Sequence, residues 1–373
     1  MNKMRVLYLT NCPAPYRVKF FNELTKYCEL TVVFEMDHAK NREDKWKSDE
    51  KYKFTAVHLK SLYCRQESAL CPSVVKYLKD FKDDIIVVGG YSTPTGMLSI
   101  IYMNMHRIPY ILNCDGGMVK DDSKLKYHIK KYFIGSAFAW LSTGEMCKQY
   151  LLHYGATEDR IYCYPFTSVR QNDIRKVDSN QKVELRRQLA IKENKMILFV
   201  GSFIYRKGLD ILLEACYDME DVALVLVGGD EIKEFLPNLT AEQKCKVYIE
   251  GFKTETEVKK YYRAADIFVL PTREDIWGLV VNEAMAVGLP VITTDQCGAG
   301  VELIRNGVNG YCIENIERLK TNILYLMDDE CARVKMAENS ISTSKNYTIE
   351  RMAEVHNTIF KSVKMYSAKG EQT

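Results

Sequence analysis

Two carboxylates frame a glycine-containing turn in the second half of the chain. Asp275 and Glu283 stand eight positions apart, with Gly278, Leu279 and Val280 between them. Acidic side chains accept hydrogen bonds from sugar hydroxyls, and the free backbone N–H groups at the start of a helix bind phosphate. The segment therefore suits a ligand that carries both groups. A buried strand, turn and helix, with both acids in solvent, would show the same pattern.

Two adjacent cations follow an earlier apolar run. The run that ends at Gly201 predicts a strand, and Gly208 begins a helical pattern. Arg206 and Lys207 thus precede a helix start, where positive charge is unfavourable unless an anion is bound. Alone, the pair also fits a solvated loop. Together with the two acids it favours a diphosphate site, with Glu283 about two turns into the next helix and directed at ribose.

Apolar runs alternate with helical patterns along the chain, which predicts an α/β fold with parallel sheets. A polar stretch at 169–195 interrupts this alternation and is expected to be a linker. We expect a Rossmann-like, acceptor-binding domain at 1–168 and a Rossmann-like, nucleotide-sugar-binding domain at 196–347. Residues 348–373 are expected to form a helix and tail that pack back on the first domain. Ligands of such sheets bind beyond the carboxyl ends of the strands, so we expect two facing domains with a cleft between them.

The composition is that of a soluble globular protein, with 47% hydrophobic and 27% charged residues. No run of about 18 apolar residues occurs, and the apolar core of the first strand is too short for a signal peptide. The 12 cysteines form no CxxC pair and the six histidines show no metal spacing. We expect a cytoplasmic protein with reduced thiols, no metal or other cofactor, and no nucleic-acid partner.

The charge is unevenly divided between the two halves. Residues 1–168 carry 24 Lys and Arg against 18 Asp and Glu, whereas the remainder carries 28 against 31. Within the basic half, the segment 120–133 mixes lysines with Leu125, Ile129 and Tyr132 at helical spacing. A solvated amphipathic helix is the favoured interpretation. Peripheral contact with the anionic inner face of a membrane is the alternative.

Four segments of the second domain resemble glycosyltransferase family 4, whose members are retaining enzymes of the GT-B fold. They are Gly201-x4-Arg-Lys-Gly-x-Asp210, Ala265-Asp-x2-Val-Leu-Pro-Thr272, the acid-x7-Glu segment, and Ala284-Met-Ala-x-Gly-x-Pro-Val-Ile292. The resemblance covers roughly residues 190–345, and the order and spacing of the segments are specific to the family.

The resemblance implies a role for each matched residue. Lys207 and Arg206 would bind the donor diphosphate, Glu283 the ribose, and Asp275 the transferred sugar. The remaining donor-binding residues would be Gly201, Ser202, Gly251, Phe252, Lys253, Gly278, Leu279 and Val280, with Gly251–Lys253 near the base. Two positions depart from the family. Asp275 stands where a glutamate is usual, with Glu274 beside it as a substitute, and Ser202 stands where an arginine is usual.

The first domain carries two further candidate segments. Pro13-x-Pro15-Tyr16-Arg17 resembles a subgroup of bacterial cell-surface polysaccharide enzymes. Pro15, Tyr16 and Arg17 are therefore candidates for the acceptor side, with Arg17 near a phosphate. A rigid turn with Tyr16 packed remains the alternative.

Asp115, Gly116 and Gly117 follow a predicted strand, where many family members carry a histidine close to the reacting sugar. Asp115 is the nearest ionisable candidate here, and the glycines would let backbone approach an acceptor. Asp115 as a simple turn residue remains the alternative.

Together these residues predict a retaining transfer of a sugar from a UDP- or GDP-linked donor to a glycan or lipid-linked acceptor in cell-surface polysaccharide synthesis. The candidates for chemistry are Asp115, Arg206, Lys207 and Asp275, of which the cations would stabilise the departing diphosphate. Two other functions fit the same pattern. One is a nucleotide-sugar 2-epimerase of GT-B type, and the other is a non-catalytic partner that binds a nucleotide sugar.

Overall fold

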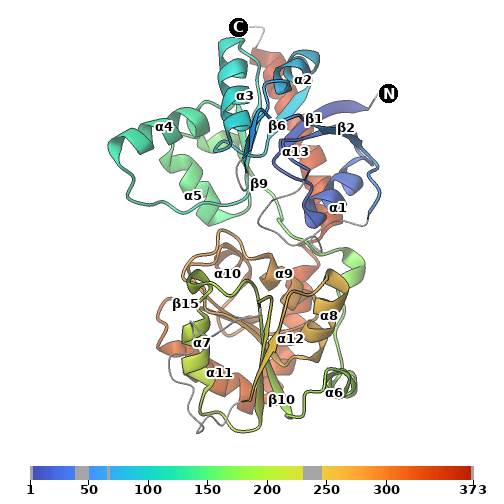
Figure 1. Ribbon diagram of the computed structural model, residues 1–373, viewed down its shortest axis with the longest axis vertical. Coiled ribbons are helices and arrows are strands. Elements are labelled where there is room, and N and C mark those ends of the chain that lie inside the picture. Colours follow the sequence, from blue (N-terminus) through green and yellow to red (C-terminus); the bar gives the residue numbers. More distant parts are fainter. Residues whose placement is uncertain (1–2, 38–49, 65–67, 230–245, 371–373) are drawn as a thin grey trace. The chain divides into compact units, whose positions relative to one another are not determined.

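The chain forms two compact units, each built on one parallel sheet (Figure 1). The computed structural model describes residues 3–37, 50–64, 68–229 and 246–370. The first unit comprises Met1–Thr167 and Ile349–Thr373, and the second comprises Ser168–Thr348. The predicted α/β class with two Rossmann-like sheets is confirmed. Among the described residues, no helix combines the length and apolar character that a membrane span requires.

The first unit contains a seven-stranded sheet in the order β3-β2-β1-β6-β7-β8-β9. In chain order its strands are β1 (Met4–Thr10), β2 (Cys28–Phe34), β3 (Thr55–His58), β6 (Ile85–Val88), β7 (Ile111–Cys114), β8 (Ala139–Ser142) and β9 (Ile161–Cys163). A separate antiparallel pair consists of β4 (Tyr63–Cys64) and β5 (Ala69–Leu70). The helices are α1 (Pro15–Leu24), α2 (Val74–Asp80), α3 (Pro94–Met105), α4 (Lys124–Gly135), α5 (Glu145–His153), the 3-10 turn η1 (Glu158–Arg160) and α13 (Ile349–Gly370).

The second unit contains a six-stranded sheet in the order β12-β11-β10-β13-β14-β15. Its strands are β10 (Lys195–Val200), β11 (Val222–Val227), β12 (Lys246–Glu250), β13 (Ile267–Leu270), β14 (Val291–Thr294) and β15 (Gly310–Ile313). Its helices are η2 (Gln171–Asp173), α6 (Ser179–Gln188), η3 (Tyr205–Lys207), α7 (Leu209–Cys216), α8 (Glu255–Ala264), α9 (Leu279–Ala286), α10 (Gly298–Leu303), α11 (Arg318–Asp328) and α12 (Glu330–Ser344).

The central strands are buried and mostly apolar because helices cover both faces of a parallel sheet. All six residues of β11 are buried, as are all four of β6, β7 and β13. In both sheets the strand order reverses beside the first strand, between β1 and β6 and between β10 and β13. Crevices that bind ligands form at such reversals, at the carboxyl ends of the strands.

Residues 169–195, which we expected to be a linker, belong to the second unit instead. The segment contains α6, whose first turn is capped by the Asp178 carboxylate at 2.9 Å from the Gln181 N–H. The buried Arg186 guanidinium then bonds the Ala264 carbonyl at 2.8 Å and Asp266 at 2.6 Å. The sequence resembles a linker because this surface helix attaches itself through a charged side chain rather than through an apolar stripe.

The last helix, α13, belongs to the first unit and packs on α1 (red in Figure 1). Its His356 is 1% exposed and packs in tilted and edge-on contacts against Phe20, Tyr164 and Phe360. Burial lowers the pKa of His356 to about 4. The imidazole is therefore neutral at neutral pH and is a packing residue of this core.

Glu35, directly after β2, is a buried carboxyl group. It is 5% exposed, and Thr93 Oγ1 donates to its Oε1 at 2.7 Å. Within the described residues its Oε2 has no hydrogen-bond partner. Burial raises the pKa of Glu35 to about 7, although the hydrogen bonds from Thr93 and the Ala69 backbone oppose this shift. Because the folded-state pKa is raised, the folded chain retains a proton that the unfolded chain releases.

Stability is therefore expected to fall as the pH rises from about 4.5 to about 7 and to change little from this group above that range. Glu35→Gln removes the titration, so we expect the variant to gain about 3 kcal/mol relative to the wild type between pH 5 and pH 8. Urea unfolding at both pH values measures this gain. The same change at the exposed Glu29 is the control, and an equal gain there would contradict the assignment.

Candidate functional site

The predicted donor residues of the second unit gather where β10 and β13 end. These neighbouring strands flank the reversal of strand order, and their following loops carry Arg206 and Lys207 on one side and Asp275 on the other. Lys207 Nζ donates to the Asp275 carboxylate in a direct ion pair. Each of the two side chains is 13% exposed. The fold thus joins a cation and an acid that lie 68 positions apart.

Arg206 lies at the outer side of this pair. Its guanidinium donates to the Glu274 carbonyl and lies 3.9 Å from the Asp275 carboxylate. With a side chain that is 43% exposed, Arg206 remains open to an incoming anion. The sequence leaves open whether Asp275 or Glu274 meets the sugar. Asp275 is the acid whose carboxylate contacts Lys207.

The turn that holds the two cations depends on Gly208. This residue has φ 71° and ψ 30°, in the left-handed region, and links η3 to α7. A Cβ at this position would lie 2.0 Å from the Pro271 carbonyl oxygen. Only glycine allows the loop after β10 to approach the loop after β13 this closely.

Arg273 ties the same two loops together. It forms a two-pronged bond with Asp210 at 2.8 and 2.6 Å, and its guanidinium lies 3.9 Å from the centre of the Tyr205 ring. The backbone N–H of Arg273 also donates to the Arg206 carbonyl at 2.8 Å. Two-pronged arginine bonds fix orientation as well as distance, so the cations are positioned before any ligand binds. Arg273 was not among the predicted site residues, although an arginine next to Glu274 is visible in the sequence.

Asp275 is fixed through its backbone. Its N–H donates to the Gln296 carbonyl at 2.8 Å, and its carbonyl accepts from Gly298 at 3.1 Å. The neighbouring Trp277 is buried, and its indole N–H donates to Asn282 at 2.9 Å. The carboxylate is therefore held next to the start of α9.

Helix α9 begins directly after Gly278, which has φ 94°. A Cβ built on Gly278 would lie 3.4 Å from Asp275 Oδ2, so the carboxylate reaches the first turn of the helix. Leu279 and Val280 are the first two helical residues, whose N–H groups have no partner within the helix. The predicted phosphate-binding amides thus stand at a helix start, beside Lys207.

Glu283 is the fifth residue of α9 and lies little more than one turn from its start, not two as expected. The reason is that the helix begins only after Gly278. The Ser168 hydroxyl donates to one carboxylate oxygen at 2.8 Å, and the Tyr262 hydroxyl donates to the other at 3.0 Å. Burial, and then Glu283 itself, raise the pKa of Tyr262 well above its usual value. Tyr262 therefore remains a donor, and the sequence offered no signal for it.

The other predicted donor residues also follow strand ends of this sheet. Gly201 and Ser202 come directly after β10, and Gly251, Phe252 and Lys253 come directly after β12, two strands away. Lys253 pairs with Glu250 at 2.8 Å. All of these positions share the carboxyl edge of one parallel sheet.

The structure also joins the two candidate segments of the first unit. Arg17, in the first turn of α1 after Pro15 and Tyr16, forms an ion pair with Asp115 after β7. Asn113 and Tyr164 donate to the same carboxylate at 2.8 and 3.3 Å. Gly117 lies against Tyr150, because a Cβ there would come within 2.5 Å of that ring. The guanidinium of Arg17 is thus already neutralised by an acid of its own unit.

Two further features of the described residues bear on the sequence analysis: possible metal ligands and the apolar side chains of α4. No group of three or more His, Cys, Asp and Glu side chains that suits a metal occurs in this part of the chain. On α4, Leu125 is 72% exposed, Ile129 44% and Tyr132 48%. His38 and Cys245 lie outside the described residues.

Comparison with known proteins finds glycosyltransferases among the relatives of this chain. A family model described as "Glycosyl transferases group 1" matches residues 181–343. Two uncharacterized glycosyltransferases of Methanocaldococcus jannaschii are both 30% identical. One alignment covers 71% of this chain and 72% of the relative, and the other covers 55% and 56%. An N,N'-diacetylbacillosaminyl-diphospho-undecaprenol alpha-1,3-N-acetylgalactosaminyltransferase of Campylobacter jejuni is 23% identical over 78% of this chain and 81% of that protein.

Among solved structures, the Anabaena protein HepE, crystallised with UDP, superposes with a TM-score of 0.74 at 16% identity, covering 98% of this chain and all of that one. Its complex with UDP-glucose gives a TM-score of 0.73 at 18% identity. This agreement establishes the GT-B fold. The family model and the Methanocaldococcus relative that is aligned over 72% of its length lead to one assignment: the chain belongs to the group 1 glycosyl transferases.

Proposed function

We propose that this protein is a retaining family 4 glycosyltransferase of cell-surface polysaccharide synthesis. It would move a sugar from a UDP- or GDP-linked donor to a glycan or lipid-linked acceptor on the cytoplasmic side of a membrane. The observation that carries the proposal is the Lys207–Asp275 pair, with Arg206 beside it, at the reversal point of the second sheet and against the start of α9.

The arrangement suits the departure of a diphosphate. Two cations and the N–H groups of Leu279 and Val280 would face the phosphates, and their charge is fixed before the bond breaks. A diphosphate would compete with Asp275 for Lys207 and leave that carboxylate to accept from sugar hydroxyls. Because the protein supplies cations, the proposal needs no metal. We assign no protein nucleophile. The acceptor would attack the anomeric carbon of the sugar from the same face as the departing diphosphate, and the anomeric configuration would be retained.

Glu283 would accept from the ribose hydroxyls. Its two oxygens already accept from Ser168 and Tyr262, which orient the carboxylate and leave lone pairs for further donors. Gly201, Ser202 and Gly251–Lys253 would lie along the nucleotide, on the same edge of the sheet. The Anabaena structures with UDP and UDP-glucose support a uridine nucleotide as the first donor to test.

The acceptor would bind to the first unit, near Tyr16, the Arg17–Asp115 pair and Gly116–Gly117. The name of the Campylobacter relative describes a diphospho-undecaprenol acceptor, which supports a lipid-linked acceptor here. The exposed apolar side chains of α4 support contact with an anionic membrane. Cosedimentation with anionic vesicles, before and after Leu125 and Ile129 are replaced by glutamate, tests that contact.

Product analysis tests the function. UDP- and GDP-sugars are first screened by thermal shift, and the best donor is then incubated with and without an acceptor mixture. We expect slow release of nucleoside diphosphate alone and faster release with formation of a glycoside of retained anomeric configuration. An isomerised nucleotide sugar would identify an epimerase. Binding without any turnover would identify a non-catalytic partner, and either result would end the proposal.

A further inference from the structure

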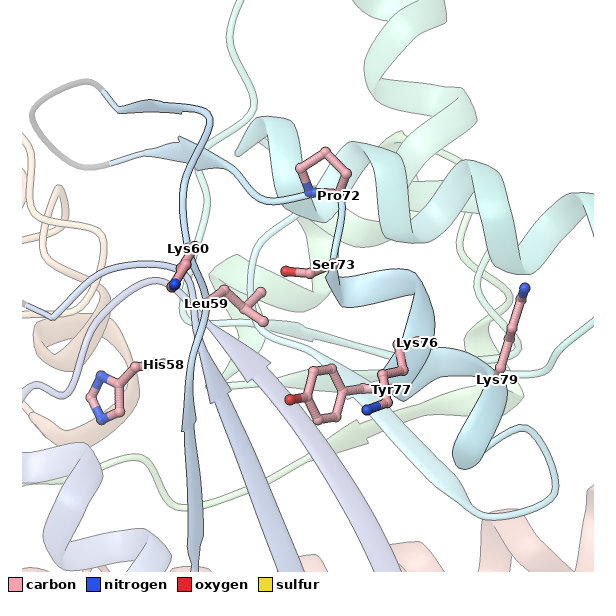
Figure 2. A pocket seen from close by; sticks show the side chains of 8 residues that line it. All are labelled: His58, Leu59, Lys60, Pro72, Ser73, Lys76, Tyr77 and Lys79. Atoms are coloured by element: carbon pink, nitrogen blue, oxygen red, sulfur yellow. The ribbon is translucent and has the colours of Figure 1, made fainter.

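A pocket of about 550 Å³ opens in the first unit, between the end of β3 and α2. Figure 2 shows its walls, which include His58, Lys60, Ser73, Lys76, Tyr77 and Lys79. None of these residues belongs to the candidate site described above. We propose that this pocket binds the phosphate group of an organic phosphate ester.

The pocket carries an excess of positive charge. Its lining contains three lysines and no carboxylate. Across the described ranges of the chain, Lys60, Lys76 and Lys79 form no ion pair, whereas Lys130, Lys148 and Lys259 each have an acid at 2.7 to 2.8 Å. An anion bound in this pocket would face positive charge without a carboxylate of the lining to compete with it.

One acid contacts the lining of the pocket: Asp37 lies 2.7 Å from Nδ1 of His58. The contact is made by Nδ1 of His58, which lines the pocket, and not by any of the three lysines. Asp37 is 75% exposed, so its charge is screened by water. The lysines therefore keep their charge available for a ligand.

The walls that carry the lysines are fixed by the core. Leu59 donates its N–H to the Phe34 carbonyl at 3.0 Å and packs against Met36, Ala69 and Cys71. Helix α2 is anchored by the fully buried Val74 and Leu78. A fixed wall lowers the entropy cost of binding, because only the lysine side chains become ordered.

The chemistry of the lining also limits the ligand. Lys76 and Lys79 are three positions apart on α2 and thus lie on one face of the helix. The Ser73 hydroxyl adds a neutral donor, while Leu59, Pro72 and the Tyr77 ring add apolar surface. Lysines and a hydroxyl bind phosphate oxygens, and the apolar wall suits the organic part of an ester.

The position separates this pocket from the proposed acceptor residues. It lies between the end of β3, the outermost strand, and α2, whereas Asp115 follows β7, four strands from β3 in the same sheet. At about 4.8 Å per strand, β3 and β7 are about 19 Å apart across the sheet, and the pocket lining shares no residue with the acceptor candidates. The inference therefore does not rest on the proposed sugar transfer, and either can fail without the other.

The test uses the full chain with Lys60, Lys76 and Lys79 changed to glutamine. The control has the same loss of charge at Lys51, Lys53 and Lys82, which are exposed in the same unit. Both sets also carry Lys207→Met, so that the proposed diphosphate site of the second unit contributes less phosphate binding. They carry Leu125→Glu and Ile129→Glu as well, so that α4 does not contribute vesicle binding. Thermal melting checks that every variant folds.

Two probes distinguish the sources of phosphate. Glycerol 3-phosphate is titrated by calorimetry, and vesicles of phosphatidylglycerol with phosphatidylcholine are compared with vesicles of phosphatidylcholine alone. We expect the pocket variant to bind at least one probe about tenfold more weakly than the control does. Weaker binding of glycerol 3-phosphate indicates a soluble ester, and weaker vesicle binding alone indicates a lipid headgroup. Equal affinities of the two variants for both probes would overturn the inference.

Discussion

Replacing Lys207 with methionine is expected to lower kcat/KM for sugar transfer by about 100- to 1,000-fold. Methionine keeps most of the length of the side chain but removes the charge that would face the departing diphosphate. Losing one such preorganised group typically costs about 3 to 4 kcal/mol of transition-state stabilisation. The change also leaves the Asp275 carboxylate, now 13% exposed beside its partner, without that cation and close to the incoming phosphates.

A double variant separates these two effects. Asp275→Asn in the Lys207→Met background removes the stranded charge, so donor affinity and thermal stability should recover while turnover stays low. Steady-state kinetics and donor titration measure the two quantities, with Lys345→Met, at an exposed position, as the control. If the double variant regained full kcat/KM, Lys207 would serve only to neutralise Asp275.

Replacing Gly208 with alanine is expected to destabilise the second unit by about 4 kcal/mol. The left-handed backbone at φ 71° costs a residue with a Cβ about 1 kcal/mol or slightly more. The larger part comes from the Pro271 carbonyl oxygen, which would lie 2.0 Å from the new carbon. Relief requires the two loops to separate, so donor affinity should fall together with stability.

Gly307 provides a matched control for this change. It has φ 75°, close to that of Gly208, but a Cβ built there meets nothing within 4 Å. Gly307→Ala should therefore cost only the backbone contribution, about 1 kcal/mol. Urea unfolding of both variants measures the difference. Equal costs would show that the close approach of the two loops does not contribute to stability.

Much of the second unit was predictable from local patterns. The strand before Gly201 and the turn at Gly208 follow from apolar runs and glycines, which act over a few residues, whereas α9 begins later than expected. Their convergence at one edge also follows, because parallel strands place their carboxyl ends on the same side. Local sequence patterns are therefore sufficient to predict that Lys207 and Asp275 lie at the same edge of the sheet.

Contacts between distant segments were not predictable in the same way. The Arg17–Asp115 pair requires β1 and β7 to be separated by a single strand, and local periodicity does not reveal strand order. Ser168 and Tyr262 meet on Glu283 for a similar reason. The role of Arg186 was hidden because a polar helix that is anchored by one buried guanidinium resembles a solvated segment.

The Ser168 hydroxyl has a further consequence. Ser168 is the residue at which the chain passes from the first unit into the second, and its hydroxyl donates to Glu283. If a bound ribose displaced the Ser168 hydroxyl from Glu283, nucleotide occupancy and the backbone conformation of this crossing would be thermodynamically linked. Linkage is reciprocal: the factor by which the bound nucleotide would shift the conformational equilibrium of the crossing equals the ratio of its affinities for the two conformations. A spectroscopic label beside Ser168 would thus report donor binding without touching the donor.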